Sequence, residues 1–258
     1  MNTRQLYPVA TLGAVAILWE AAVIVFRIPR FLLPAPTDIW DAGMKNWSTL
    51  MSNSAVTVGE TMAGFGLSIA VGVPLAILIV YSRTLEQILY PLLVASQTVP
   101  KIAIAPLFVV WLGFSSLPKV LVAFLIAFFP IVIDTVIGLE SADPDTLQLV
   151  RSMGASTWDT FRKIRFPSAM PNIFGGLKVA MTLAVVGAIV GEFVGSNSGL
   201  GYLLLVATGN IDTPLLFADI VVLTLIGVTL FYIVELFERI MTPWHPRTRA
   251  EDLANVTL

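Results

Sequence analysis

The sequence lacks the residues that several classes of active site require. It contains no cysteine and a single histidine, His245. Thiol chemistry, disulfide bonds and the usual Cys and His spacings of zinc sites are therefore excluded. It also contains no Gly-Lys pair, so it has no P-loop that could cradle ATP phosphates. We expect no catalytic residue, no metal site and no cofactor in this chain.

Charged side chains are also scarce. They make up 12% of the 258 residues, whereas 57% of the residues are hydrophobic. An average soluble domain has roughly 25% charged residues. The net charge of −2 gives no sign of a nucleic acid or of an acidic partner. This composition indicates an all-α integral membrane protein.

Six apolar runs are long enough to cross a bilayer as helices, which takes ~20 residues each. They cover residues 6–26, 61–81, 89–112, 120–139, 173–194 and 217–237. We therefore expect six transmembrane helices.

An even number of spans places both termini on one side of the membrane. One side collects the basic residues Arg4, Arg83, Arg151, Arg162, Lys163, Arg165, Arg239, Arg247 and Arg249. The other side collects Arg27, Arg30, Lys45 and Lys119. Since cytoplasmic loops carry the excess of Lys and Arg, we expect both termini in the cytoplasm.

Because the sequence shows no internal repeat, we expect a single transmembrane domain over residues 1–258. Residues 1–60 contain the first span and an interfacial helix, residues 61–240 the five core spans, and residues 241–258 a cytoplasmic tail. The interfacial helix follows Pro36, can be capped by Thr37 or Asp38, and carries Trp40 and Trp47.

A polar segment at residues 140–171 separates the fourth and fifth spans. Asp143 fits the N-cap of a short helix with Pro144 in its first turn, and Gly154 fits the left-handed residue that ends it. Ser156 and Asp159 have the spacing of a capping box that begins a second helix. We expect Phe166-Pro167 to end that second helix and Pro171 to open the next span.

The second helix carries an apolar stripe, Trp158, Phe161 and Ile164, beside basic residues. From the residues alone two interpretations stay open. The segment is either a solvated connector or a docking helix for a cytoplasmic partner.

The spacing of this segment resembles a known signature. The cytoplasmic signature of ATP-binding-cassette (ABC) importer permeases is written EAA, three residues, G, nine residues, I, one residue, LP. This sequence resembles it from the glycine onward, with Gly154, nine residues, Ile164, one residue and then Phe166-Pro167. Gln148-Leu149-Val150 stands where the family has Glu-Ala-Ala. The stretches "FLLPAPTDIW", "TVPKIAIAPLFVVWLGF", "GEFVGSNSGLGYLL" and "FERIMTPWHP" resemble permeases of the nitrate, sulfonate and taurine importers.

The resemblance implies a type I ABC importer permease fold, like that of methionine importer permeases, with a coupling loop between the fourth and fifth helices. It implies a permease subunit in the bacterial cytoplasmic (inner) membrane that imports nitrate, a sulfonate, taurine or a similar small anion or zwitterion by alternating access. The partners would be a second permease copy forming a homodimer, two cytoplasmic ATPase subunits that hold ATP and Mg, an external binding protein and membrane lipid. The ATPase-coupling residues would be Arg151, Gly154, Ala155, Ser156, Trp158, Phe161, Ile164, Phe166 and Pro167.

Polar residues inside the apolar runs need a partner or a water path. Gln97, Thr98 and Lys101 flank Pro100 in the third span, where a kink frees backbone groups, and with Glu192 they are our candidates for the translocation pathway or gate. Glu20 in the first span can pair with a partner or reach the surface. Gly187, Gly191 and Gly195 form a small-residue ridge for helix packing within or between permeases.

A secondary transporter or channel, which works without an ATPase, is the alternative that composition alone allows. It does not account for two capped helices at the permease spacing.

Overall fold

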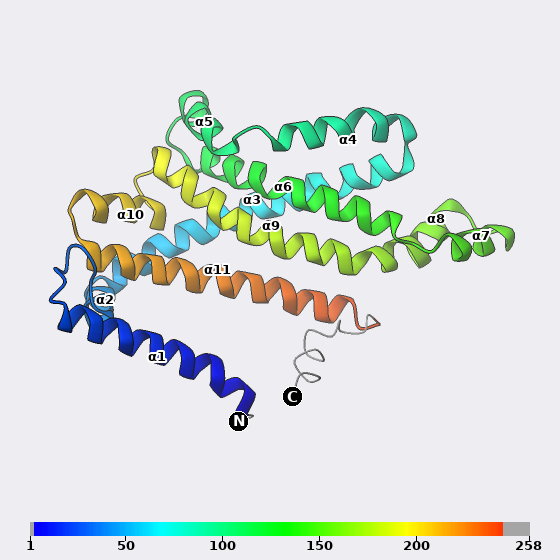
Figure 1. Cartoon of the computed structure of the whole chain (residues 1–258). Helices are drawn as coiled ribbons and strands as arrows, with labels where there is room; N and C mark the ends of the chain where they lie inside the picture. Colours follow the sequence, from blue (N-terminus) through cyan, green and yellow to red (C-terminus); the bar gives the residue numbers. More distant parts are fainter. Residues whose placement is uncertain (1–2, 245–258) are drawn as a thin grey trace. The chain divides into compact units, whose positions relative to one another are not determined.

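The computed structural model describes residues 3–244, and these form helices joined by short turns, with no strand within that range (Figure 1). The all-α prediction is confirmed. Most of the expected tail, from His245 onward and with Arg247 and Arg249, lies outside the described residues.

The apolar runs all form helices. Four helices are long and apolar enough to cross a membrane: α3 (Trp47–Tyr81), α6 (Ser116–Glu140), the continuous stretch Thr157–Gly195 that ends in α9 (Phe166–Gly195), and α11 (Thr213–Met241). Within α1 (Thr3–Val25), the apolar part Ala10–Val25 is a shorter helix of the same character.

The third expected span is broken. Helix α4 (Arg83–Gln97) is followed by a 3₁₀ turn, η1 (Lys101–Ile104), and by α5 (Ala105–Leu112). The two halves pass the test for a span only as a bent pair. Pro100 lies in the break and cannot donate a helical hydrogen bond, so the expected kink is confirmed.

The expected cap of the interfacial helix is wrong. Helix α2 (Pro36–Lys45) has Ala35 at its N-cap, so Thr37 lies inside the first turn and cannot be the N-cap itself. Glu20 of α1 takes that role, since its carboxylate accepts hydrogen bonds from the Thr37 backbone N–H (3.2 Å) and hydroxyl (2.8 Å). Trp47, which we expected on this helix, is the first residue of α3.

The chain divides into two compact units. The first comprises the residues up to Ala63 together with Ile102–Ala123 and Val185–Val228. The second comprises Gly64–Lys101, Phe124–Ala184 and the residues from Thr229 onward. The boundaries fall inside α3, η1, α6, α9 and α11, so these helices contribute to both units.

Each unit has an apolar core of its own. In the first unit, Leu50 of α3 packs with residues of α10 (Leu200–Gly209) and α11, namely Leu200, Leu203, Ala207, Leu215 and Leu223. In the second unit, Ala76 and Ile79 of α3 pack with Val132 and Val136 of α6.

Candidate functional site

The polar segment between α6 and α9 is built in the second unit from locally satisfied turns. Helix α7 (Pro144–Ser152) begins at Asp143, whose carboxylate accepts the backbone N–H groups of Asp145 and Thr146, each at 3.2 Å. The Thr146 hydroxyl donates to the same carboxylate at 2.6 Å. Together these donors, the Thr146 hydroxyl foremost, lower the pKa of Asp143. The expected cap is confirmed.

Helix α7 ends at a glycine in a Schellman motif. Gly154 has φ +81°, which a residue with a side chain rarely adopts. Its N–H donates to the Arg151 carbonyl at 3.0 Å, and the Ala155 N–H reaches back to the Val150 carbonyl at 3.2 Å. The predicted left-handed stop at Gly154 is confirmed.

Helix α8 (Thr157–Thr160) begins at Ser156, whose hydroxyl oxygen accepts the Asp159 N–H at 3.0 Å and donates to the Asp159 carboxylate at 2.6 Å. Lys163 pairs with the same carboxylate at 2.8 Å. The capping-box spacing therefore marks a real helix start.

The expected end of this second helix is wrong. A π-helical turn, η2 (Phe161–Arg165), follows α8, and the Phe166 N–H bonds to the Phe161 carbonyl five residues back. The chain then runs straight into α9, with Pro167 in its first turn and Pro171 inside it. A proline is tolerated in the first turn of a helix because its missing N–H is not needed there.

The apolar stripe divides into exposed and packed residues. Trp158 is 66% exposed, whereas Phe161 and Ile164 are half-buried. The Phe161 ring packs against Tyr81, Trp158 and Phe166, with centroid distances of 5.9, 5.6 and 5.7 Å. The exposed apolar side chains of this segment are Leu149, Met153 and Trp158, of which sequence reasoning singled out only Trp158.

The three pathway candidates of the third span lie at its break. Gln97 is the last residue of α4, and Thr98 is its C-cap, with its hydroxyl donating to the Ala95 carbonyl at 2.7 Å. The Lys101 ammonium lies 3.9 Å from the centre of the Phe129 ring. This cation–π contact stabilises the positive charge of Lys101, which is half-buried.

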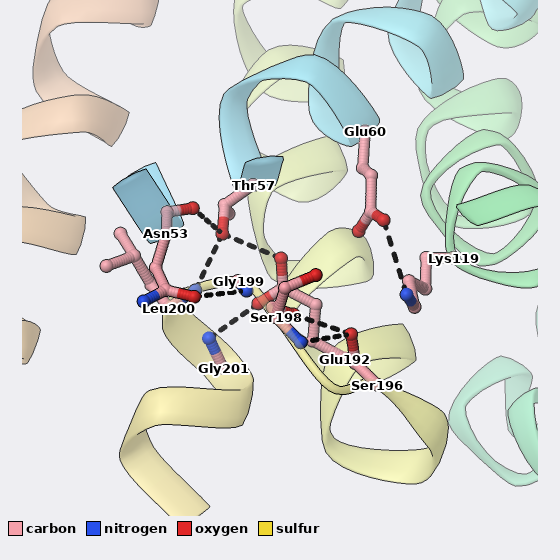
Figure 2. A network of polar contacts seen from close by, with 10 residues as sticks. All are labelled: Asn53, Thr57, Glu60, Lys119, Glu192, Ser196, Ser198, Gly199, Leu200 and Gly201. Carbon is pink, nitrogen blue, oxygen red and sulfur yellow. Dashed lines mark hydrogen bonds and ion pairs between the residues drawn. The ribbon is translucent and has the colours of Figure 1, made fainter. Parts of the chain in front are cut away.

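Glu192 lies elsewhere, in a buried polar network of the first unit (Figure 2). Its carboxylate accepts the Thr57 hydroxyl at 2.6 Å and the Gly201 N–H at 2.5 Å. The Thr57 hydroxyl oxygen in turn accepts the Leu200 N–H at 2.8 Å, and Asn53 accepts the Gly199 N–H at 2.7 Å. The network joins α3 to the turn between α9 and α10.

A buried ion pair lies beside this network. Lys119 of α6 approaches Glu60 of α3 at 3.4 Å, and both side chains are 4% exposed (Figure 2). Sequence reasoning counted Lys119 only among the basic residues of the non-cytoplasmic side and did not single out Glu60. One signal was available, because Asn53, Thr57, Glu60 and Thr61 recur at the spacing of one helical face.

The glycine ridge of α9 lies against its own chain. A Cβ atom on Gly187 would come within 2.6 Å of the Ala123 Cα, and one on Gly191 within 2.8 Å of the Lys119 Cα, both in α6. On Gly195 it would meet the Val109 side chain of α5 at 2.8 Å. These contacts hold α9 against its neighbours within the first unit.

No group of three or more His, Cys, Asp and Glu side chains that could hold a metal ion occurs within residues 3–244. What these residues do form is two built features, a capped polar loop in one unit and a buried polar network in the other.

Comparison with known proteins identifies the family. Residues 68–244 match the family described as binding-protein-dependent transport system inner membrane component. The chain is 38% identical to the riboflavin transport system permease protein RibX of Chloroflexus aurantiacus over 239 residues, which cover 91% of this chain and 88% of that protein.

Two further relatives carry different names. The formylaminopyrimidine transport permease protein ThiX of Halalkalibacterium halodurans is 38% identical over 90% of this chain and 92% of its own length. The taurine transport system permease protein TauC of Escherichia coli is 25% identical over 92% of this chain and 89% of its own length. The resemblance to taurine-type permeases is therefore confirmed.

Among solved structures, a chain of the MetNI methionine ABC transporter matches with a TM-score of 0.66 at 18% identity, covering 77% of this chain and 98% of that chain. This match confirms the expected methionine-importer-like fold. The chain belongs to the family of inner membrane components of binding-protein-dependent transport systems, with the fold of an ABC importer permease.

Proposed function

We propose that this chain is the permease subunit of an ATP-driven importer and forms the path of a small solute across the membrane. The family match over residues 68–244 carries the proposal. The chain has no P-loop, so energy from ATP has to come from a partner subunit. Two permease copies, two cytoplasmic ATPase subunits and an external binding protein would complete the transporter.

The coupling element in this proposal is the polar segment from Asp143 to Phe166. Its helices are short, and their ends are held by Asp143, by the Gly154 turn and by Ser156, so it can transmit force without unwinding. Exposed Leu149, Met153 and Trp158 supply an apolar surface that fits a cleft on another protein. The packed Phe161 links that surface to Tyr81 of α3.

The transport cycle we propose is alternating access. ATP binding brings the two ATPases together, and the seated segments follow them. The permeases then open outward to receive solute from the binding protein. This movement is largely rigid-body, as expected where a short helix is packed on long ones. Both termini and the coupling segment lie in the cytoplasm in this proposal.

The solute we propose is small and anionic or zwitterionic, such as nitrate, a sulfonate or taurine. Two relatives at 38% identity are named for riboflavin and formylaminopyrimidine, so heterocyclic solutes belong in the test set. A thermal-shift screen of the partner binding protein identifies the class of solute. The compounds to test are sulfonates, taurine, nitrate, riboflavin and pyrimidines.

The central experiment is reconstitution. We expect solute uptake into liposomes only when the chain is joined by its ATPase and binding protein, with ATP hydrolysis stimulated by the loaded binding protein. Uptake by the chain alone, without ATP, would contradict the proposal and support a secondary transporter or channel.

A second experiment tests the coupling segment. Trp158→Ala should weaken ATPase binding and uncouple hydrolysis from uptake while the protein stays inserted in the membrane. Trp111→Ala, at a tryptophan of α5 with nearly the same exposure (67%), is the matched control and should leave ATPase binding unchanged. Gly154→Asp, or Phe161→Ala with Ile164→Ala, should uncouple as well. Normal transport in all the coupling variants would show that the segment is only a connector.

A further inference from the structure

Helix α10 begins in a buried place without a cap of its own. Its N-cap, Gly199, has no side chain, and Gly199, Leu200 and Gly201 are all buried. The first N–H groups of any helix have no partner inside the helix. Because these three residues are buried, their N–H groups are shielded from water and each requires an acceptor.

Three side chains from other helices supply those acceptors (Figure 2). Asn53 of α3 accepts from Gly199, Thr57 of α3 accepts from Leu200, and Glu192 of α9 accepts from Gly201. The Thr57 hydroxyl closes the set by donating to Glu192 at 2.6 Å. Thr57 and Glu192 are both fully buried.

The two glycines make this arrangement possible. Gly199 has φ +102°, and a Cβ atom there would collide with the Glu192 carboxylate. A Cβ atom on Gly201 would lie 2.8 Å from a Glu192 carboxylate oxygen. The backbone of α10 can approach the carboxylate this closely only because both positions lack a side chain.

An apolar contact reinforces the polar one. Leu200, Leu203 and Ala207 of α10 are buried in the core cluster that includes Leu50 of α3. Leu50 lies one turn before Asn53, so the same side of α3 supplies both the apolar and the polar contact. Moving α10 away from α3 would leave the buried N–H groups of Gly199 and Leu200 unpaired and would open this core.

We propose that Asn53, Thr57 and Glu192 are positioning residues that fix α10 to α3 throughout transport, so that α10 moves with α3 rather than opening as a separate gate. Glu192 acts here as a hydrogen-bond acceptor for a helix end, not as a contact for the solute. The part of this inference that concerns transport rests on the proposed function, whereas the part that concerns α10 does not.

The absence of cysteine from the chain gives a test with no background labelling. A single reporter, Leu203→Cys, places a thiol at a position in α10 that is 6% exposed. In the purified permease complex, Thr57→Val should raise the labelling rate of this thiol about tenfold, the change that ~1.4 kcal/mol of local opening gives.

Thr61→Val is the matched control. Thr61 lies one turn further along α3, is equally buried, and its hydroxyl has no hydrogen-bond partner in the part of the chain that the structure describes. The same isosteric change should alter labelling less than about twofold. Equal effects of the two valines would overturn the proposal.

Glu192 variants separate an acceptor from a charge. In Glu192→Gln the amide oxygen can accept from Gly201, and its NH₂ can donate to Thr57, whose hydrogen then turns to the Asn53 carbonyl, 3.2 Å away. We expect labelling near the reporter's own rate for Glu192→Gln and about tenfold faster for Glu192→Leu. Equally fast labelling in both would overturn the acceptor role.

A cross-link tests whether α10 moves with α3. Asn53→Cys and Ser198→Cys place thiols on α3 and on the residue before Gly199, whose N–H bonds to Asn53, so that a bismaleimide can join them. Since Asn53→Cys itself removes one acceptor, uptake by the double variant before cross-linking is the reference. Uptake should persist after cross-linking, whereas loss of uptake on cross-linking alone would show that α10 has to separate. If no ATP-dependent uptake occurs in any variant, the proposed function fails. The labelling series still decides whether Asn53, Thr57 and Glu192 hold α10.

Discussion

At the scale of single residues, several carboxylates of this chain accept hydrogen bonds from the first turn of a helix. Glu20, Asp143 and Glu192 each accept N–H groups at the start of a helix, α2, α7 and α10 respectively. An oxygen acceptor is favourable there because the first N–H groups of a helix have no partner within the helix. Asp143 could be predicted from the sequence because it caps its own helix, as Asp212 does for α11, where its carboxylate accepts the Leu215 N–H at 3.2 Å. Glu20 and Glu192 reach helices that begin 16 and 8 residues later, and nothing local marks such partners.

Glu20→Ala should loosen the start of α2. The change removes both acceptors of Thr37, and a lost helix cap costs about 1 kcal/mol. Hydrogen exchange followed by mass spectrometry should show faster exchange over Pro36–Lys45. Glu20→Gln, which keeps one acceptor oxygen, is the control and should exchange more slowly than the alanine variant. Unchanged exchange in Glu20→Ala would mean that α2 is held by its packing alone.

Asp143 gives α7 a predictable response to pH. Its pKa lies below the ordinary value, so its cap contributes stability fully above the usual Asp pKa of about 3.9 and loses it as the pH falls through the lowered pKa. Protection of the Asp145 and Thr146 amides, corrected for intrinsic exchange, should stay constant from neutral pH to about 5 and fall in more acidic solution. Asp143→Asn, which caps without titrating, should remove this dependence. A fall in protection near neutral pH would contradict the assignment.

At the scale of helices, sequence periodicity located every apolar run but misplaced several ends. The 35-residue α3 begins 14 residues before the expected span, because Asn53, Thr57 and Glu60 find partners inside the first unit and need no water. The stretch Thr157–Gly195 is continuous although it contains Pro167 and Pro171, and a π turn directly precedes Pro167. Polar residues and prolines end a helix in water more reliably than in a packed interior.

The glycine ridge of α9 should be intolerant of side chains on one face only. Gly187→Ala places a methyl group 2.6 Å from the Ala123 Cα, and overpacking of this kind costs about 1 to 3 kcal/mol. Gly175→Ala, in the same helix, meets nothing within 4 Å of the added atom and should be neutral or slightly stabilising. Thermal unfolding of the purified chain in detergent compares the two. Equal melting temperatures would show that α6 can move aside.

At the scale of the whole molecule, the family and the helical architecture followed from the sequence, whereas the buried polar network did not. The signature spacing from Gly154 to Pro167 and the glycine-rich stretch after α9 are local patterns. Their residues lie close together in the sequence, so the sequence alone reveals them. The pairing of Asn53 with Gly199 joins residues 146 positions apart. The ion pair of Lys119 could not be predicted for the same reason, since its buried partner Glu60 lies on another helix.

The membrane orientation can be checked with single cysteines, because the chain has none of its own. Met153→Cys on the coupling segment and Met44→Cys on α2 replace side chains that are 77% and 56% exposed. In right-side-out vesicles an impermeant maleimide should label position 44 and spare position 153, and inverted vesicles should give the opposite result. Labelling of both positions from one side would contradict six spans with cytoplasmic termini.

The π turn at Phe161–Arg165 also sets the rotational phase of the coupling segment. One extra residue in a turn offsets everything before it by about 100° around the helix axis, since an α-helix has 3.6 residues per turn. The direction in which Trp158 points is therefore tied to α9 through this one wide turn. In the proposed transporter, a one-residue insertion or deletion at this turn would rotate the apolar side chains of the segment relative to the ATPase without altering the spans.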